Sequence, residues 1–375
     1  MPRVDLNLQV DIERTPRVVQ LEGIFDVPEA KRQTVDFHFD VPIEEHDWQI
    51  GLIVGPSGAG KTSVARHMFG DCIVSGYDWH TSRSLVDSFD SKHSIRDVTA
   101  ALSAVGFSSP PSWLKPFRVL SNGQQFRATM ARLLLDERPL AVVDEFTSVV
   151  DRTVAQIGSC ALSKAIRRGS RKFVAVSCHD DIVEWLQPDW ILEPHAGRFA
   201  WRLLRRRPAI ELDIRRCSPA LWSLFAPHHY LTAELNRSAR CFAAYYHGRP
   251  VAFSSWLPFV GKLKDARQAR RTHRNVCLPD FQGVGIGTAT VDTIAQAWAA
   301  MGLRVFHRTG HPGDIAAHVR NREWVLCHHG VVSGGGDPNL GGAMKRSFGR
   351  KGASFEFVGK KMPKDEAQRL LNAEC

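Results

Sequence analysis

Two glycine-rich loops with the composition of phosphate-binding sites lie in different halves of the chain. Residues 55–62 read GPSGAGKT and residues 282–287 read QGVGIG. In the first loop, the glycines let backbone N–H groups turn around phosphate oxygens, Lys61 reaches the β- and γ-phosphates, and the Thr62 hydroxyl binds Mg²⁺. In the second loop, the glycines aim backbone N–H groups at a pyrophosphate. The spacing predicts a nucleoside triphosphate site in the first half and a second phosphate-binding turn in the other half.

The elements around the first loop are those that such a site requires. Residues 50–54 predict a buried parallel strand, and a helix is expected over residues 62–69. A second buried strand, over residues 139–143, ends in Asp144, which is placed to hold Mg²⁺, and Glu145, which is placed to polarise the attacking water. The predicted nucleotide ligands are Gly55, Ser57, Gly58, Gly60, Lys61, Thr62, Ser63 and Asp144, and the predicted metal ligands among them are Thr62 and Asp144.

Three further motifs follow in a fixed order. Residues 120–125 read LSNGQQ and precede a helical pattern, residues 148–151 read SVVD, and His179 follows an expected strand over residues 173–177. Together with the first loop, these motifs resemble ABC-type ATPases, whose LSGGQ signature has its first glycine replaced by Asn122 here. The resemblance implies that His179 is a catalytic switch histidine. It also implies ATP contacts from three signature residues: Ser121, Gly123 and Gln124.

The same resemblance implies a homodimer when ATP is bound. In ABC-type ATPases the signature segment of one copy meets the ATP held by the other copy, so Ser121 and Gly123 are expected to act in trans. No glutamine occurs between Thr62 and Gln124. The glutamine that couples the ATP site of transporters to a membrane partner is therefore missing, which argues against a transporter subunit.

The second half carries a different pattern. Residues 210–214 alternate as a half-buried strand does, and His247-Gly248-Arg249 joins two strand runs as a hairpin. The QGVGIG loop leads into a helical pattern, and a strand follows over residues 303–306. This arrangement resembles the GNAT acetyltransferase superfamily; a dinucleotide-binding turn is the competing interpretation. The GNAT resemblance implies coenzyme A contacts from six residues: Val276, Leu278, Gln282, Gly283, Gly285 and Gly287.

The sequence departs from the GNAT pattern at the expected catalytic acid. Many GNAT enzymes use a tyrosine beyond the strand that ends here at Phe306, but the four tyrosines are residues 77, 230, 245 and 246. Asp280, just before the glycine loop, and His311 are our candidate catalytic residues, since both types of side chain transfer protons. For each of them, an ordinary polar residue at a strand end remains the alternative interpretation.

The positive charge belongs to the second half. Residues 201–375 hold 27 Lys and Arg against 13 Asp and Glu, a net charge of +14, whereas residues 1–200 carry a net charge of −4. A basic half predicts a polyanionic partner, DNA or RNA first, with the phosphates of coenzyme A as the alternative. Residues 228–231 and 308–312 also resemble phage Mom-type DNA modification proteins, which implies adenine in DNA as an acceptor.

The fold class predicted for the whole chain is α/β. A P-loop ABC-type ATPase domain is expected over residues 1–205, followed by a mixed α/β GNAT acyltransferase-like domain over residues 206–375. The 375 residues suffice for two cores, no apolar run approaches about 20 residues, and eight scattered cysteines fit a reducing compartment. We therefore expect a cytoplasmic protein without a membrane partner.

The combined expectation is a protein that binds ATP and Mg²⁺ and uses acetyl-CoA, or another acyl-CoA, to modify nucleic acid bases. Two alternatives stay open. One is an N-acetyltransferase for a protein or a small amine that is regulated by ABC dimerisation. The other is a mechanochemical ABC protein in DNA repair or translation whose GNAT part is a degenerate binding module.

Overall fold

The structure, a computed structural model, describes residues 3–25, 28–29, 32–201, 210–229, 234–259, 268–331 and 351–373. These residues form two compact units, each assembled from separate segments of the chain. Unit 1 comprises Met1–Tyr77, Asp136–Val150 and Ser163–Pro208, and unit 2 comprises Asp78–Leu135, Asp151–Leu162 and Ala209–Cys375. The predicted domain boundary at residue 205 lies outside the described residues, as do Tyr230 and Leu231 of the Mom-like motif.

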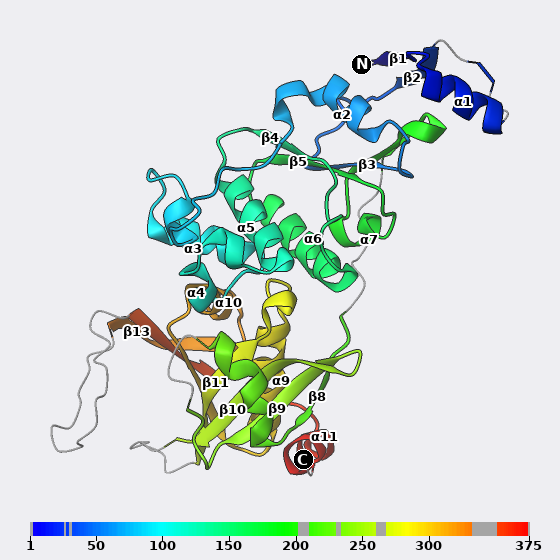
Figure 1. The fold of residues 1–375 in the computed structure, drawn as a ribbon. Coiled ribbons are helices and arrows are strands. Elements are labelled where there is room, and N and C mark those ends of the chain that lie inside the picture. Colours follow the sequence, from blue (N-terminus) through cyan, green and yellow to red (C-terminus); the bar gives the residue numbers. More distant parts are fainter. Residues whose placement is uncertain are drawn as a thin grey trace. The chain divides into compact units, whose positions relative to one another are not determined.

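Unit 1 is built on a five-stranded sheet in the order β4-β5-β3-β6-β7, of which Figure 1 labels β3, β4 and β5. Its strands are β3 (Ile50–Val54), β4 (Leu140–Val143), β5 (Lys172–Ser177), β6 (Trp190–Glu193) and β7 (Arg198–Trp201). The first four are parallel, and β7 runs antiparallel to β6. The strands predicted over residues 50–54, 139–143 and 173–177 are thus confirmed to within a residue. Every residue of β3 is buried, as an inner parallel strand requires.

The core of unit 1 is organised around Trp190 on β6. Its ring lies 5.4 Å from that of Trp48 and 6.3 Å from that of Phe69, measured between centroids. A Cβ atom on Gly51 would come within 2.1 Å of the Trp190 ring, so this glycine makes room for the indole. Two helices complete this part of unit 1: α2 (Lys61–Phe69) and α7 (Ile182–Leu186).

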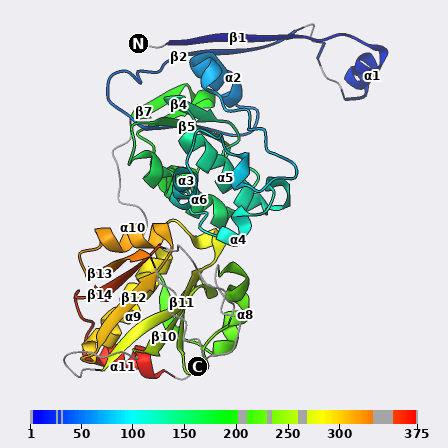
Figure 2. The same cartoon turned by 90° about the vertical axis from the view of Figure 1, so that its left-hand side faces the viewer.

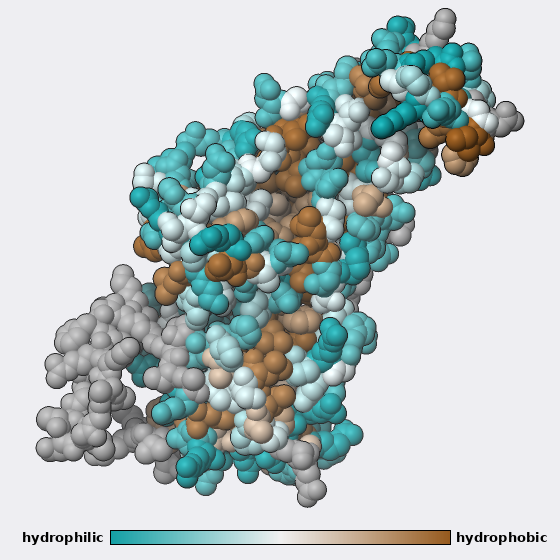
Figure 3. Space-filling model, viewed as in Figure 1, coloured by the Kyte–Doolittle hydropathy of each residue, from teal (hydrophilic) through white to brown (hydrophobic). Residues whose placement is uncertain are grey.

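A long antiparallel ribbon precedes this sheet in the sequence. Strands β1 (Arg3–Asp11) and β2 (Arg32–Asp40) pair along their whole length, and helix α1 (Pro16–Phe25) connects them (Figure 2). No residue of α1 is buried. Four apolar side chains of α1 are exposed: Val19, Leu21, Ile24 and Phe25. Figure 3 shows hydrophobic surface in the region of this helix.

Unit 2 combines a group of helices with a second sheet. The helices are α3 (Ile95–Ala104), α4 (Pro110–Trp113), α5 (Asn122–Leu135) and residues 152–162 of α6 (Arg152–Ile166). At the start of α3, Ser94 and Asp97 form a capping box, which satisfies backbone N–H groups of the first turn. Helix α5 buries Phe126, Met130 and Leu133, whose spacing is that of one helical face.

The sheet of unit 2 has seven strands in the order β13-β14-β12-β11-β10-β9-β8. Its strands are β8 (Asp213–Arg216), β9 (Arg240–Tyr246), β10 (Arg249–Pro258), β11 (Ala269–Cys277), β12 (Arg304–Thr309), β13 (Trp324–Val331) and β14 (Lys351–Phe357). Among the described strands of this sheet, only β11 and β12 pair in parallel, with α9 (Ile286–Ala300) between them in the sequence. The predicted hairpin is confirmed, since His247 and Gly248 both adopt positive φ in a two-residue turn between β9 and β10.

Helices cover both faces of this sheet (Figure 2). On β9, Phe242 packs with α9 and α11 (Lys364–Asn372), whereas its neighbour Ala243 packs with α8 (Trp222–Phe225). This alternation follows from the two-residue repeat of a strand. Helix α10 (Pro312–Arg320) follows β12. Within the described part of the chain, no helix has both the length and the hydropathy to span a bilayer.

The strand predicted over residues 210–214 is wrong in its bounds, because β8 covers Asp213–Arg216. Ile210 and Leu212, which produced the alternating pattern, are partly buried against a cluster that includes Ala244 and Phe281. They therefore contribute side-chain packing without joining the backbone ladder of β8 and β9.

Candidate functional site

The phosphate loop of unit 1 connects β3 to α2. Gly58 and Gly60 take φ values of 79° and 73°, which favour glycine. Gly60 is the N-cap of α2 and offers no side-chain hydrogen bond to the first turn of the helix. The first N–H groups of α2 therefore lack a side-chain cap, and this end of the helix favours an anion. A Cβ atom on Gly60 would also lie 2.1 Å from the Phe37 ring of β2.

Lys61 is the cation of this loop. Its Nζ donates a hydrogen bond to the backbone oxygen of Pro56 at 2.7 Å, within the loop itself. The ammonium group is thus held by a neutral carbonyl rather than by a carboxylate. A neutral partner of this kind can be exchanged for a phosphate oxygen without leaving an acid unpaired.

The predicted acid pair follows β4. Asp144 is half-buried, and its Oδ1 accepts a hydrogen bond from the backbone N–H of Glu145 at 2.9 Å. Glu145 itself has a φ of 50° and an exposed side chain. The Ser148 hydroxyl donates to the Glu145 backbone oxygen at 2.7 Å, which stabilises the turn. A backbone hydrogen bond therefore fixes the Asp144 carboxylate, whereas the Glu145 side chain is exposed to solvent.

His179 follows β5, which lies between β4 and β3 in the sheet. Its backbone N–H donates to the Ser177 hydroxyl at 3.1 Å, and Ser177 pairs with Val54, the last residue before the phosphate loop. Because the carboxyl ends of parallel strands meet at one edge of a sheet, the phosphate loop, the acid pair and His179 share that edge. The structure therefore brings together the catalytic segments that the sequence predicted in unit 1.

The signature residues lie at the start of α5 in unit 2. The Ser121 hydroxyl accepts a hydrogen bond from the Gln124 backbone N–H at 3.3 Å, and the Gln124 side chain accepts one from the Ser121 backbone N–H at 3.2 Å. This reciprocal pair is a capping box. Gly123 is buried, and a Cβ atom there would lie 3.1 Å from Val154 of α6 and 3.4 Å from the Asp280 carboxylate. Local capping and close packing thus fix this motif.

One turn further along α5, Arg127 contacts the loop that precedes α9. Its guanidinium donates to the backbone oxygens of Pro279 and Asp280 at 2.6 Å and 2.8 Å, and it lies 3.3 Å from the Asp280 carboxylate. The Arg127 side chain is fully buried, whereas half of the Asp280 side chain is exposed. Burial lowers the pKa of Arg127, and the neighbouring Asp280 opposes this shift. Asp280, a predicted catalytic acid, is therefore the counter-ion of a buried arginine.

Two residues of the predicted coenzyme loop already have protein partners inside unit 2. The Gln282 side chain accepts from the Ser108 backbone N–H at 2.6 Å and donates to the Cys277 backbone oxygen at 2.8 Å. A Cβ atom on Gly283 would lie 2.6 Å from Cα of Gly106, at the end of α3. Gln282 and Gly283 thus pack against the helical part of unit 2, which the sequence did not indicate.

The two glycines nearest to α9 are arranged differently. Gly285 is the N-cap of α9 with a φ of 101°, and a Cβ atom there would meet no atom within 4 Å. The Gly287 backbone N–H bonds to the Cys277 thiol, whose pKa burial raises to about 12. In β11, Val276 pairs with Phe253, and the Leu278 backbone N–H donates to the Val251 oxygen at 2.9 Å. The Leu278 N–H is thus already used within the protein.

His311 lies at the N-cap of α10. Its ring lies 6.4 Å from that of Trp113 in α4, and its backbone N–H donates to the Thr309 hydroxyl at 3.1 Å. Burial lowers the pKa of His311. The imidazole is therefore neutral near pH 7, and it would act as a base rather than as an acid.

A group of ionisable residues that the sequence reasoning missed lies beside His311. His307 of β12 and His318 of α10 each contact the carboxylate of Asp314, which also lies on α10. Burial raises the pKa of Asp314, but its hydrogen bonds to the two histidines and their charges outweigh burial and hold that pKa well below its usual range. The four-residue spacing of Asp314 and His318 places both on one face of a helix, and this was the available signal.

Comparison with known proteins concerns the N-terminal part of the chain. The cytochrome c biogenesis ATP-binding export protein CcmA of Rhodospirillum rubrum is 29% identical over 161 residues, covering 35% of this chain and 68% of CcmA. The N-terminal part of this chain is similar to ABC ATPase cassettes. No protein-family model matches the chain.

Two solved structures are also similar. The dimeric bacterial ABC transporter cassette MJ0796 is 14% identical, covering 46% of this chain and 93% of that chain with a TM-score of 0.35. A bacterial Atm1-family ABC exporter with ATP bound is 20% identical, covering 44% of this chain and 35% of that chain with a TM-score of 0.34. The GNAT and Mom resemblances of the second half stay predictions.

Proposed function

We propose that this protein is an ABC-type ATPase that binds ATP with Mg²⁺ and hydrolyses it. One observation carries the proposal. The strand order β4-β5-β3 places the phosphate loop, the acids Asp144 and Glu145, and His179 at the same edge of the sheet in unit 1. Similarity to CcmA, an ATP-binding export protein, supports the same reading.

The roles of the residues follow from their geometry. Lys61 exchanges the Pro56 carbonyl for phosphate oxygens, and the uncapped N-terminus of α2 receives the phosphates. The Thr62 hydroxyl and Asp144 hold Mg²⁺, which neutralises phosphate charge. The exposed carboxylate of Glu145 orients and deprotonates the attacking water, and His179 hydrogen-bonds the phosphate that leaves. Gly55, Ser57, Gly58, Gly60 and Ser63 complete the phosphate cradle.

We further propose that ATP joins two copies of the chain. The capping box formed by Ser121 and Gln124 holds a helix N-terminus with a serine hydroxyl beside it, which is a suitable clamp for the γ-phosphate bound by the other copy. Two ATP molecules would then be buried at the interface between the two copies. Hydrolysis removes the phosphate that both copies share, so it releases the pair.

The contact between Arg127 and the loop before α9 would couple the ATPase cycle to the sheet of unit 2. Arg127 lies on the helix that the signature motif begins, and it holds the backbone of Pro279 and Asp280. A displacement of α5 on ATP binding is therefore transmitted to the loop and to the start of α9. We propose that ATP occupancy controls whatever the sheet of unit 2 binds.

A second candidate function is acyl-CoA binding by unit 2. The strand order of the seven-stranded sheet, its single parallel pair β11–β12 and the glycine N-cap of α9 support a GNAT-like domain. The open position beside Gly285 and the N–H groups of the first turn of α9 would take the pyrophosphate. Gln282, Gly283 and the Leu278 N–H have protein partners instead, so the coenzyme contacts would be fewer than the sequence predicted. Asp280 and His311 stay candidates for proton transfer, and nucleic acid stays the proposed acceptor.

ATP turnover and ligand binding test these proposals separately. The purified chain should hydrolyse ATP in the presence of Mg²⁺, and Lys61→Ala should abolish nucleotide binding in a calorimetric titration. Absence of ATP binding by the wild-type chain would refute the main proposal. Calorimetry with acetyl-CoA tests the second candidate, and Gly285→Asp, which places a carboxylate at the proposed pyrophosphate site, should abolish that binding. Titration of labelled DNA and RNA at low salt tests the acceptor.

A further inference from the structure

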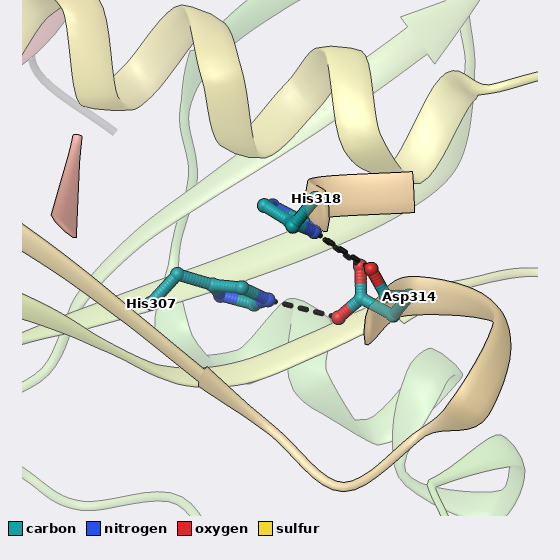
Figure 4. A group of neighbouring side chains, drawn as sticks. All are labelled: His307, Asp314 and His318. Carbon is teal, nitrogen blue, oxygen red and sulfur yellow. Dashed lines mark hydrogen bonds and ion pairs between the residues drawn. The ribbon is translucent and has the colours of Figure 1, made fainter. Parts of the chain in front are cut away.

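Three side chains in unit 2 converge in the space between β12 and α10 (Figure 4). His307 comes from the strand, and Asp314 and His318 come from the helix. The Nε2 atom of His307 lies 2.8 Å from Asp314 Oδ2, and Nδ1 of His318 lies 3.1 Å from Asp314 Oδ1. One nitrogen from each imidazole and one carboxylate oxygen therefore lie within 4.8 Å of one another.

Both histidine side chains of the cluster are buried, and of the three residues only Asp314 reaches solvent. The His307 and His318 side chains are 1% and 0% exposed, whereas 29% of the Asp314 side chain is exposed. The ring of Trp324 packs edge-on against both imidazoles, with centroid distances of 5.8 Å and 5.1 Å. A small ligand could thus approach along the carboxylate while the aromatic wall excludes bulk water.

An outer hydrogen bond orients the His307 imidazole. Nδ1 of His307 lies 3.0 Å from the Thr272 hydroxyl, which leaves its Nε2 directed at Asp314. A hydroxyl partner of this type fixes the tautomer and the ring plane of a histidine that binds a metal ion. Nδ1 of His318, the nitrogen that faces the Asp314 carboxylate, also lies 2.9 Å from the Asp314 backbone oxygen, and an ion would replace that contact.

Hydrogen bonding within the protein does not complete the cluster. Within the described part of the chain, Nε2 of His318 is buried and has no hydrogen-bond partner. Most buried polar atoms in proteins do have one. Nε2 is not the nitrogen that faces Asp314, so an ion shared with Asp314 would bind Nδ1 of His318, and Nε2 would carry the proton of the imidazole.

We propose that His307, Asp314 and His318 bind a divalent transition-metal ion of the zinc type. Two imidazoles and one carboxylate suit Zn²⁺ and its close relatives, whereas Mg²⁺ and Ca²⁺ prefer all-oxygen sets. Metal–ligand bonds of about 2.0–2.2 Å place neighbouring ligand atoms about 3–3.5 Å apart. The two contacts with Asp314 are close to that spacing, and the ligand atoms as a set lie within 4.8 Å, so the side chains would draw together around an ion. Three protein ligands leave a coordination position for water on the side that Asp314 exposes. The proposal does not depend on ATP hydrolysis.

Cobalt binding to the full-length chain tests the site directly, because Co²⁺ reports its own coordination by visible d–d absorption. After treatment with a chelator, the wild-type protein should bind Co²⁺ in equimolar amount and develop this absorption, and Zn²⁺ should displace it. His307→Asn and Asp314→Asn should each abolish the absorption. His328→Gln changes an exposed histidine of β13 outside the cluster and should leave it intact. Equimolar binding that survives in both cluster variants would overturn the proposal.

A variant outside the ligand set covers the case in which those substitutions disturb folding. Thr272→Val keeps the shape of the side chain but removes the partner of His307 Nδ1, so it should weaken Co²⁺ binding about 10–100-fold. In the wild-type protein, Zn²⁺ should also raise the Tm, because the ion binds only the folded chain, and Mg²⁺ at the same concentration in the absence of nucleotide should not. A wild-type protein that gives neither the Co²⁺ absorption nor the rise with Zn²⁺ would refute the site.

Discussion

The Arg127 guanidinium donates a hydrogen bond to the backbone oxygen of Asp280 at 2.8 Å, joining residues that are 153 positions apart in the chain. Arg127 lies one turn beyond the signature motif, and Asp280 lies just before the glycine loop of α9. The side chain of Arg127 is completely buried. Burying an arginine costs free energy that only its partners offset, so this contact favours one position of the loop relative to α5.

Replacing Arg127 tests whether the contact transmits the nucleotide state. Arg127→Met keeps much of the side-chain volume but leaves the Pro279 and Asp280 oxygens without their donor. We expect unit 2 to lose about 2–4 kcal/mol of unfolding free energy. Hydrogen exchange of residues 279–287 should respond to ATP in the wild type and not in the variant. Arg118→Met, at an exposed site, should behave as the wild type, and an unchanged ATP response in Arg127→Met would contradict the coupling.

Two glycines of the loop before α9 form a matched pair. Gly283 and Gly285 have φ values of 89° and 101°, so alanine is strained at both positions by about 1–2 kcal/mol. At Gly283 the new methyl group would also clash with the Gly106 backbone at 2.6 Å, whereas at Gly285 it would meet nothing within 4 Å. Urea denaturation should therefore show a clearly larger loss of unfolding free energy for Gly283→Ala. Equal losses would mean that the contact with Gly106 is absent in solution.

Glu145 should separate ATP binding from ATP hydrolysis. Glu145→Gln removes the base but keeps the shape of the side chain, so the rate of hydrolysis should fall about 10²–10⁴-fold. ATP affinity should change little, and the chain should sediment as a dimer with ATP because the shared phosphate is not released. Glu45→Gln, an exposed acid in the same unit, serves as the control. A variant that hydrolyses ATP at the wild-type rate would exclude Glu145 as the base.

His273 gives unit 2 a pH-dependent stability. Burial, followed by the charges of Arg274 and Arg271, lowers the pKa of His273 to about 4, against 6.5 for an unperturbed histidine. Between these two values the unfolded chain binds more protons than the folded chain, so the unfolding free energy increases with pH. Because His273 is only half-buried, solvent screening should limit its contribution to about 1 kcal/mol.

Urea denaturation at about pH 4.5 and about pH 7.5 measures this contribution. His273→Gln should reduce the difference in unfolding free energy between the two pH values. His80→Gln, at an exposed position of the same unit, should not. A pH difference that is identical in His273→Gln and in the wild type would show that His273 titrates normally.

Cys277 should be an unreactive thiol. Burial raises its pKa to about 12, although the Arg127 charge and the Gly287 N–H act in the opposite direction. Iodoacetamide reacts with the thiolate form of cysteine. At about pH 8 it should therefore modify exposed Cys178 far faster than Cys277. Peptide mass spectrometry measures both rates, and labelling in urea shows whether both thiols react once unfolded. Equal rates in the folded chain would contradict the raised pKa of Cys277.

Local sequence determined the strands and loops around the phosphate site of unit 1. The GPSGAGKT loop, the apolar run before it and the acids after β4 each encode a strand, a turn or a helix start within a few residues, and the structure places all of them as predicted. The capping box at the start of α5 and the hairpin turn at His247 and Gly248 are local in the same sense. Such features follow from the conformational preferences of neighbouring residues, so a single sequence contains them.

Contacts between distant residues were decided only by the tertiary structure. The sequence marked Asp280 and Gln282 as groups for catalysis and coenzyme binding, but it contained no sign that Arg127 and the Ser108 N–H would hold them. Nor did it show that His307 would meet Asp314 and His318, because a strand and a helix must first pack together. Sequence patterns record what each segment prefers by itself, whereas the partner of a buried charge is set by how the segments pack.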